Sequence, residues 1–287
     1  NDAFGSCALY NNTTGCRNVA VGKGTMQLNT EGECNVAVGH TALSANTTGD
    51  FNTGLGVKAL NANTTANNNT AVGFKSLGTN TTGHSNTAVG ACSMFDNTEG
   101  DNNVAVGRLA LANNTTACNN VAIGYDSSFT NTTGHSNTAV GYISLCLNTT
   151  GDCNVAVGFH SMDSNTTGDC STAVGADALQ ANTTGCCNVA VGNNALRLNT
   201  TASDNTAVGI RAMCSNTTGT PNTAVGKDSL CANTTGTCNT SVGSASLKAN
   251  TTGCENTAIG QQALSCNTTG EFNTAILVDI LSLQFVA

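Results

Sequence analysis

A short motif, Asn-Thr-Ala-Val-Gly or Asn-Val-Ala-Val-Gly, returns every 17 residues along this chain with no insertion or deletion. Its closing glycine stands at Gly5, Gly22, Gly39 and onward to Gly260, and Leu277 takes the next place in the series. A fixed short period over almost a whole chain is typical of repeat proteins, in which each copy is one structural unit stacked on its neighbours. The period therefore constrains the fold more than the length of 287 residues does.

Each copy contains two extended runs separated by corners. The motif itself has the alternating, β-branched character of a strand, and a second run, Ala-Leu followed by two variable residues, comes after the closing glycine. The glycines and a turn, Asn-Thr-Thr-Gly, supply the corners, and so few residues between corners cannot form a stable helix. We predict an all-β fold, a parallel β-solenoid of about sixteen 17-residue coils with two short strands per coil. Stacked coils would lie about 4.8 Å apart.

Small residues must supply the core, because aromatics are 4% of the chain and tryptophan is absent. We expect the motif Ala, the motif Val and the Leu or Met four residues after the closing glycine, here termed the Leu position, to form one thin core shared by stacked coils. Ser128 interrupts the Leu position, and Phe129 is expected to fill the apolar place. The predicted domains are a continuous solenoid over 1–275 and an apolar cap, joint or stub over 276–287.

Two residue types of the motif have evident structural uses. The closing glycine indicates a bend with positive φ or a close backbone approach. The motif Asn recurs from Asn1 to Asn273, with Ser171 the one exception, and predicts a ladder of side-chain amides from coil to coil. The chain begins in phase with the repeat and without a methionine, so we expect it to be a mature or trimmed piece of a longer protein.

The turn Asn-Thr-Thr also matches the acceptor sequence for N-glycosylation. The candidate sites are Asn12, Asn46, Asn63, Asn80, Asn114, Asn131, Asn148, Asn165, Asn182, Asn199, Asn216, Asn233, Asn250 and Asn267. Turn chemistry alone is the alternative, since Asn tolerates left-handed geometry and caps its own backbone. Two copies, with Glu31 and Glu99 in place of the second Thr, keep the Asn but lose the acceptor, so the turn needs Asn in either case. The first turn Thr recurs in every complete copy and predicts a threonine ladder.

The 15 cysteines favour an oxidising compartment, and their odd number leaves at least one unpaired within the chain. Two pairs flank a turn at equivalent positions and are candidate disulfides, Cys146 with Cys153 and Cys231 with Cys238. Neighbouring coils offer rival pairings at an allowed Cα separation. These rivals are Cys153 with Cys170, Cys170 with Cys187, Cys214 with Cys231, and Cys16 with Cys34.

Composition argues against several function classes. A net charge of −8 and a pI near 4.7 remove the electrostatic basis for nucleic-acid binding, and no apolar run is long enough for a membrane span. His84 and His135 share a repeat position but lie three coils apart, too far to share a metal ion. The aspartates after the turn resemble a solvated edge, and no nucleophile, base and orienting group occur together. We therefore expect no enzyme activity, no cofactor and no metal site.

The run Asn120-Val121-Ala122-Ile123-Gly124 and its copies resemble the head repeats of YadA-like trimeric autotransporter adhesins and related repeats of phage and viral fibre proteins. This resemblance covers nearly the whole chain. It implies a parallel β-roll, often with three chains packed side by side, that serves as an extracellular fibre or adhesive head.

We accordingly expect a structural, non-catalytic subunit of an extracellular fibre or adhesin, located outside the cell or on a cell or virion surface. The expected partners are copies of the same chain, side by side or end to end, together with N-glycans along one edge. The invariably small motif residue fits either lateral packing or a pinched solenoid interior. The alternative functions are a ligand- or ice-binding solenoid that uses a threonine ladder, and a scaffold whose outer surface is sugar.

Overall fold

The computed structural model describes residues 1–277, so most of the expected cap, joint or stub over 276–287 lies outside the described residues. The chain divides into two compact units, Asn1–Ser171 and Thr172–Ala287. Both units are parallel β-solenoids with one coil for each copy of the repeat, and residues 1–277 contain no helix. The predicted fold class is confirmed. None of these residues therefore forms a helix that could cross a membrane.

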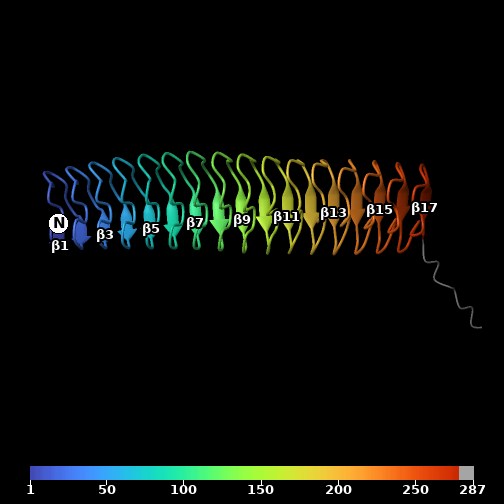
Figure 1. The fold of residues 1–287 in the computed structure, drawn as a ribbon, viewed down its shortest axis with the longest axis horizontal. Helices are drawn as coiled ribbons and strands as arrows, with labels where there is room; N and C mark the ends of the chain where they lie inside the picture. Colours follow the sequence, from blue (N-terminus) through green and yellow to red (C-terminus); the bar gives the residue numbers. More distant parts are fainter. Residues whose placement is uncertain (278–287) are drawn as a thin grey trace, which may run out of the picture. The chain divides into compact units, whose positions relative to one another are not determined.

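The first unit contains a row of short parallel strands in strict register, each formed by the motif residues before the closing glycine. Val104 of one strand pairs with Val121 of the next, and Ala105 pairs with Ala122. Figure 1 shows these strands side by side in chain order from the blue end. They are β1 (Asp2–Phe4), β2 (Val19–Val21), β3 (Val36–Val38), β4 (Thr53–Leu55), β5 (Thr70–Val72), β6 (Thr87–Val89), β7 (Val104–Val106), β8 (Val121–Ile123), β9 (Thr138–Val140) and β10 (Val155–Val157).

The second unit repeats this arrangement with the same register. Thr206 pairs with Thr223, and Ala207 pairs with Ala224. Its strands are β11 (Thr172–Val174), β12 (Val189–Val191), β13 (Thr206–Val208), β14 (Thr223–Val225), β15 (Thr240–Val242), β16 (Thr257–Ile259) and β17 (Thr274–Ile276).

Each coil has one strand rather than the two that the sequence predicted. The run through the Leu position is a series of turns in which non-glycine residues take left-handed backbone angles, with φ of 59° at Leu109 and 52° at Leu111. Each such residue costs about 1–2 kcal/mol. Backbone hydrogen bonds between coils, such as Leu111 N–H to Ser127 O at 2.9 Å, and burial of the leucine side chain offset this cost.

The core is narrower than predicted. The motif Ala and the residue at the Leu position are fully buried, as Ala105 and Leu111 illustrate. The motif Val points outward instead, because successive side chains of a strand face opposite sides. Val106 accordingly remains 36% exposed. The expectation that the motif Val belongs to the core is therefore wrong.

Phe129 does not take over the interrupted Leu position. Ser128 keeps the inward place with a φ of 52° and is buried, whereas Phe129 is only half-buried. The hydroxyl of Ser128 has no hydrogen-bond partner among the described residues. The register of the coil explains why Ser128 and not Phe129 points inward. The coil keeps its backbone hydrogen bonds to both neighbouring coils, so the residue at the Leu position faces the core whatever its type.

The closing glycines adopt the positive φ that was predicted. Gly73 has a φ of +134°, and a Cβ on it would lie 2.5 Å from the carbonyl oxygen of Gly90 on the next coil. Glycine is therefore required both by the dihedral angle and by the close approach of neighbouring backbones.

Candidate functional site

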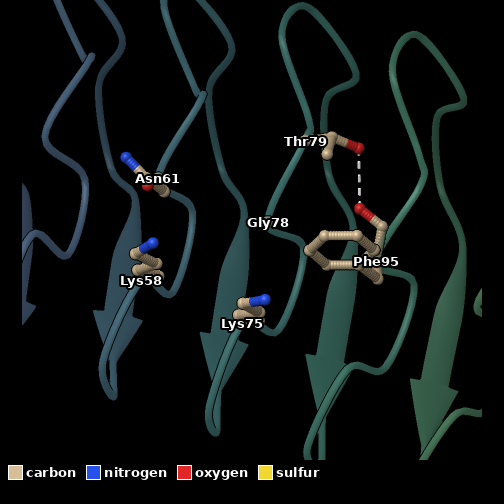
Figure 2. A pocket seen from close by; sticks show the side chains of 6 residues that line it. All are labelled: Lys58, Asn61, Lys75, Gly78, Thr79 and Phe95. Carbon is tan, nitrogen blue, oxygen red and sulfur yellow. Dashed lines mark hydrogen bonds between the residues drawn. The ribbon is translucent and has the colours of Figure 1, made fainter.

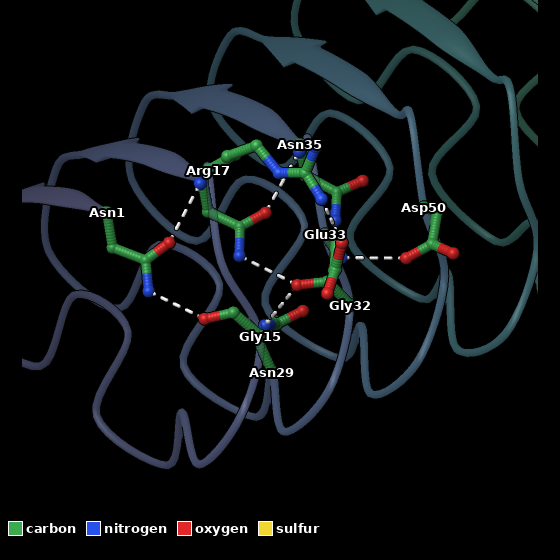
Figure 3. Close-up of polar contacts among 9 residues, drawn as sticks. Asn1, Gly15, Arg17, Asn29, Gly32, Glu33, Asn35 and Asp50 are labelled. Carbon is green, nitrogen blue, oxygen red and sulfur yellow. Dashed lines mark hydrogen bonds and ion pairs between the residues drawn. The ribbon is translucent and has the colours of Figure 1, made fainter.

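The motif Asn links neighbouring coils, but mainly through backbone groups, whereas amide-to-amide bonds were predicted and occur in only some copies, such as Asn103 to Asn86. The backbone N–H of Asn18 donates to Oδ1 of Asn1 at 2.8 Å, and Nδ2 of Asn18 donates to the carbonyl of Gly32 at 2.7 Å (Figure 3). Asn1 makes the equivalent bond to Gly15 at 2.7 Å. The amide therefore bonds to backbone groups of two other segments and stays buried.

The turn Asn forms a second, amide-to-amide ladder that the sequence analysis did not anticipate. Nδ2 of Asn148 donates to Oδ1 of Asn131 and to the carbonyl of Gly151, both at 2.9 Å. Its Oδ1 accepts from Nδ2 of Asn165 at 2.8 Å. Asn29, which lacks the glycosylation acceptor, makes the same bond to its predecessor. This ladder is the reason that the turn requires Asn in every copy.

The candidate glycosylation sites are these ladder residues, and the folded coil does not expose them. All have no exposed surface except Asn12 and Asn267, which are half-buried. A glycan attaches at Nδ2, the atom that the ladder buries and commits to two acceptors. The geometry therefore argues against the expected edge of glycans, since attachment would break the ladder at each site.

The first turn Thr forms the predicted threonine ladder. Oγ1 of Thr149 donates to the carbonyl of Thr166 at 3.0 Å, and the side chain is half-buried. The second turn residue is the exposed one, as at Thr150. Within each unit this second position forms an outward row of threonines, interrupted by Glu31 and Glu99.

The outer face of the sheet carries an exposed apolar row. The motif Val residues of successive strands lie in register about 4.8 Å apart, and all point outward. Val89 and Val106 are each 36% exposed, and Ile123 is 39% exposed. No strand from β2 to β17 contains a charged residue. A contiguous exposed apolar row of this kind is typical of an interaction surface.

An aromatic row follows the closing glycines of three successive coils. The rings of Tyr125 and Tyr142 stack with centroids 5.5 Å apart, and Phe159 continues the stack at the same spacing. Nη1 of Arg108 donates to the hydroxyl of Tyr125 at 3.0 Å. The sequence analysis missed this row, although aromatics at one repeat position in three consecutive copies were a visible signal.

The carboxylates after the turn cap backbone groups rather than form a merely solvated edge. The backbone N–H of Glu33 donates to Oδ1 of Asp50 at 2.7 Å (Figure 3). His84 takes part in the same pattern, since its Nδ1 accepts from the N–H of Asn67 at 3.0 Å. No group of three His, Cys, Asp or Glu side chains is placed to hold a metal ion within residues 1–277.

The candidate disulfides across a turn are not formed. Cys146, Cys153, Cys231 and Cys238 all carry free thiols. Register is the reason, because it places equivalent positions of neighbouring coils side by side rather than the two flanks of one turn. Burial, with the nearby charge of Asp126, raises the pKa of the Cys146 thiol to about 11.

Register brings several of the rival cysteine pairs side by side, among them Cys153 with Cys170 and Cys214 with Cys231. Cys214 and Cys231 occupy equivalent positions of successive coils, and both carry free thiols. The neighbouring Cys231 thiol, with the positive charges of Arg197 and Arg211, lowers the pKa of the Cys214 thiol to about 7. The neighbouring Cys214 thiol, with burial, raises the pKa of the Cys231 thiol.

Comparisons with known protein families, with curated proteins and with solved structures found no match for this chain.

Proposed function

We propose that this protein is a non-catalytic structural subunit of an extracellular fibre or adhesin, and that it associates side by side with copies of itself. The row of outward motif Val residues carries this proposal. An exposed apolar row of this kind lowers the solubility of a protein unless a partner covers it. The resemblance to adhesin head and fibre repeats supports a location outside the cell or on a cell or virion surface.

A second copy of this chain is the occupant that the row fits best. The strands β2 to β17 carry no charge, so two chains with a net charge of −8 can approach there without placing like charges face to face. Both partners would present the same row of β-branched side chains at the same spacing, about 4.8 Å. Identical periodic surfaces interdigitate along their whole length without any special fit at one point.

The test is the oligomeric state of the purified protein in solution. We expect sedimentation at a multiple of the chain mass of 28.7 kDa. A variant with Val106→Lys and Ile123→Lys should sediment as a monomer, because lysine at these exposed sites breaks the apolar row without entering the core. The matched control carries Thr116→Lys and Thr133→Lys in the exposed turn row, and it should keep the wild-type mass.

A monomeric wild type at the highest soluble concentration would overturn lateral association. Loss of association in the control as well would show that added charge, and not the apolar row, controls the oligomer. Filaments of indefinite length that survive both sets of substitutions would favour end-to-end stacking instead.

A second candidate function follows from the exposed row of second turn residues. The second turn residue is Thr in 14 of 16 copies, and within each unit successive members lie about 4.8 Å apart. Such a row suits recognition of a regular lattice, with ice as the obvious example. Thermal hysteresis of the purified protein is the measurement, and freezing at the melting point would exclude ice binding.

A further inference from the structure

A hollow of about 230 Å³ opens on the surface of the first unit. It arises among the residues that directly follow the Leu position in three successive coils, namely Asn61, Gly78 and Phe95. Gly78 has no side chain, so a gap remains between its two neighbours. Figure 2 shows the six lining residues, which are Lys58, Asn61, Lys75, Gly78, Thr79 and Phe95.

The hollow depends on the glycine and on the ring that leans over it. A Cβ on Gly78 would lie 2.7 Å from Cε2 of Phe95 and 2.8 Å from Cδ2. The backbone of Gly78 does not lie in the left-handed region, so its dihedral angles do not require glycine. The absent side chain therefore lets the Phe95 ring lie against the Gly78 backbone, where it forms one wall of the hollow.

Two ammonium groups lie along one side of the hollow. Lys58 and Lys75 occupy the same repeat position on successive coils, where Lys75 N–H donates to the carbonyl of Val57 at 3.0 Å. Nζ of Lys75 lies over the rings of Phe74 and Phe95, 5.3 Å and 5.6 Å from their centroids. Neither lysine belongs to any of the ion pairs found in residues 1–277. Two adjacent unpaired cations repel each other, and an anion between them removes this repulsion.

The remaining polar groups further restrict the chemical class of ligand that the hollow can bind. Oγ1 of Thr79 already donates to the carbonyl of Phe95 at 2.7 Å (Figure 2), and Nδ2 of Asn61 donates to Oγ of Ser44 at 2.6 Å. The hollow thus offers the two lysine ammonium groups as donors and the side-chain oxygen Oδ1 of Asn61 as an acceptor for a hydroxyl group. The Phe95 ring supplies one flat apolar wall. Its volume is below the range of drug-sized pockets and suits a single ring.

We propose that this hollow binds a carboxylated sugar ring, with the carboxylate between Lys58 and Lys75 and the apolar face of the ring against Phe95. Asn61 accepts a hydrogen bond from a ring hydroxyl. A simple inorganic anion would use the lysines but leave the aromatic wall unused, whereas a neutral sugar would leave the two cations uncompensated. This binding does not depend on lateral association of the chains.

The experiment is a titration of the full chain, labelled with ¹⁵N, with sodium glucuronate, glucose and inorganic phosphate at constant ionic strength. Glucuronate should shift the amide resonances around Lys58, Gly78 and Phe95, and glucose and phosphate should bind at least about tenfold more weakly. Lys75→Gln should weaken glucuronate binding about tenfold, since it removes one charge-assisted hydrogen bond. Lys248→Gln, on a coil of the second unit, is the matched control and should change nothing.

Gly78→Ala is the second variant, because its methyl group would overlap the Phe95 ring and displace this wall of the hollow, while the backbone angles allow alanine. We expect it to abolish the glucuronate shifts and to keep the far-ultraviolet circular dichroism spectrum. Three outcomes would overturn the proposal. These are no saturable shift with glucuronate, equal affinity for phosphate, or wild-type affinity in both Lys75→Gln and Gly78→Ala.

Discussion

Replacing Ser128 by leucine should stabilise the protein. Every other described coil carries Leu or Met at this inward position, and Ser128 lies between Leu111 and Leu145 in the row. The cluster of buried apolar residues that starts at Ala20 ends at Ala122, just before the interruption. The change Ser128→Leu restores the row.

Two contributions set the expected gain. Full burial of a leucine side chain contributes about 1.5–3 kcal/mol. The substitution also removes the buried hydroxyl of Ser128 that has no partner, which costs about 1–3 kcal/mol. Overpacking offsets part of this sum, by about 1 kcal/mol. The left-handed backbone adds no difference, because Leu111 adopts the same φ of 52° as Ser128. We therefore expect the free energy of unfolding to rise by about 1.5–5 kcal/mol.

Urea denaturation followed by circular dichroism measures this difference. Ser136→Leu is the matched control, because Ser136 has a similar φ of 59° but lies on the surface. It should leave stability within about 0.5 kcal/mol of the wild type. If Ser128→Leu lowered the midpoint, or matched the surface control, the interrupted row would not be an underfilled part of the core.

Four further outcomes are expected. Asn148→Ala should lower the free energy of unfolding by about 2–5 kcal/mol, because it removes the two donated hydrogen bonds and the one accepted hydrogen bond of a buried amide. Urea denaturation measures this loss. Gly73→Ala should prevent stable stacking at that coil, since its methyl group would meet the Gly90 carbonyl, and limited proteolysis should detect the opening. Iodoacetamide should alkylate Cys214 at a rate that rises through about pH 7, because its lowered pKa yields the reactive thiolate there, whereas the Cys231 thiol should remain protonated. Peptide mass spectrometry measures both alkylation rates. A midpoint for Cys214 above about pH 8.5 would refute the lowered pKa. The intact mass of the protein secreted from a glycosylating host should equal the sequence mass of 28.7 kDa, and added hexose masses would contradict the buried ladder.

The period and the motif were sufficient to predict the solenoid, the glycine bends and a coil-to-coil role for the motif Asn, although its partners are mainly backbone groups. They were not sufficient for the path of the chain between corners. Leucine is not a residue that favours left-handed backbone angles, so nothing at Leu111 in the sequence indicates a turn instead of a second strand. The sequence also did not indicate to which face of the sheet the Val106 side chain points. A strand of only three residues is too short for its alternation of residue types to distinguish the inner face from the outer one.

The turn Asn shows a different limit of sequence reasoning. An acceptor sequence describes what an enzyme recognises in an accessible chain, and burial of Asn148 is a property of the stacked coil. The copies with Glu31 and Glu99 carried the one useful hint, that the Asn persists without the acceptor. The hollow beside Gly78 could have been predicted by comparing successive copies position by position. The residue directly after the Leu position has a side chain in the neighbouring copies but is glycine at Gly78.

The ladders also affect how the gene can change in length. Each amide-to-amide bond of the turn Asn joins equivalent residues 17 positions apart, such as Nδ2 of Asn148 and Oδ1 of Asn131. Within a unit, duplication or loss of one whole copy would therefore bring equivalent partners together again at the new junction. A deletion of a single codon would instead displace every amide of that coil from its acceptor. Recombination between the nearly identical copies is thus tolerated in steps of one repeat, and selection against other length changes explains why no copy differs in length.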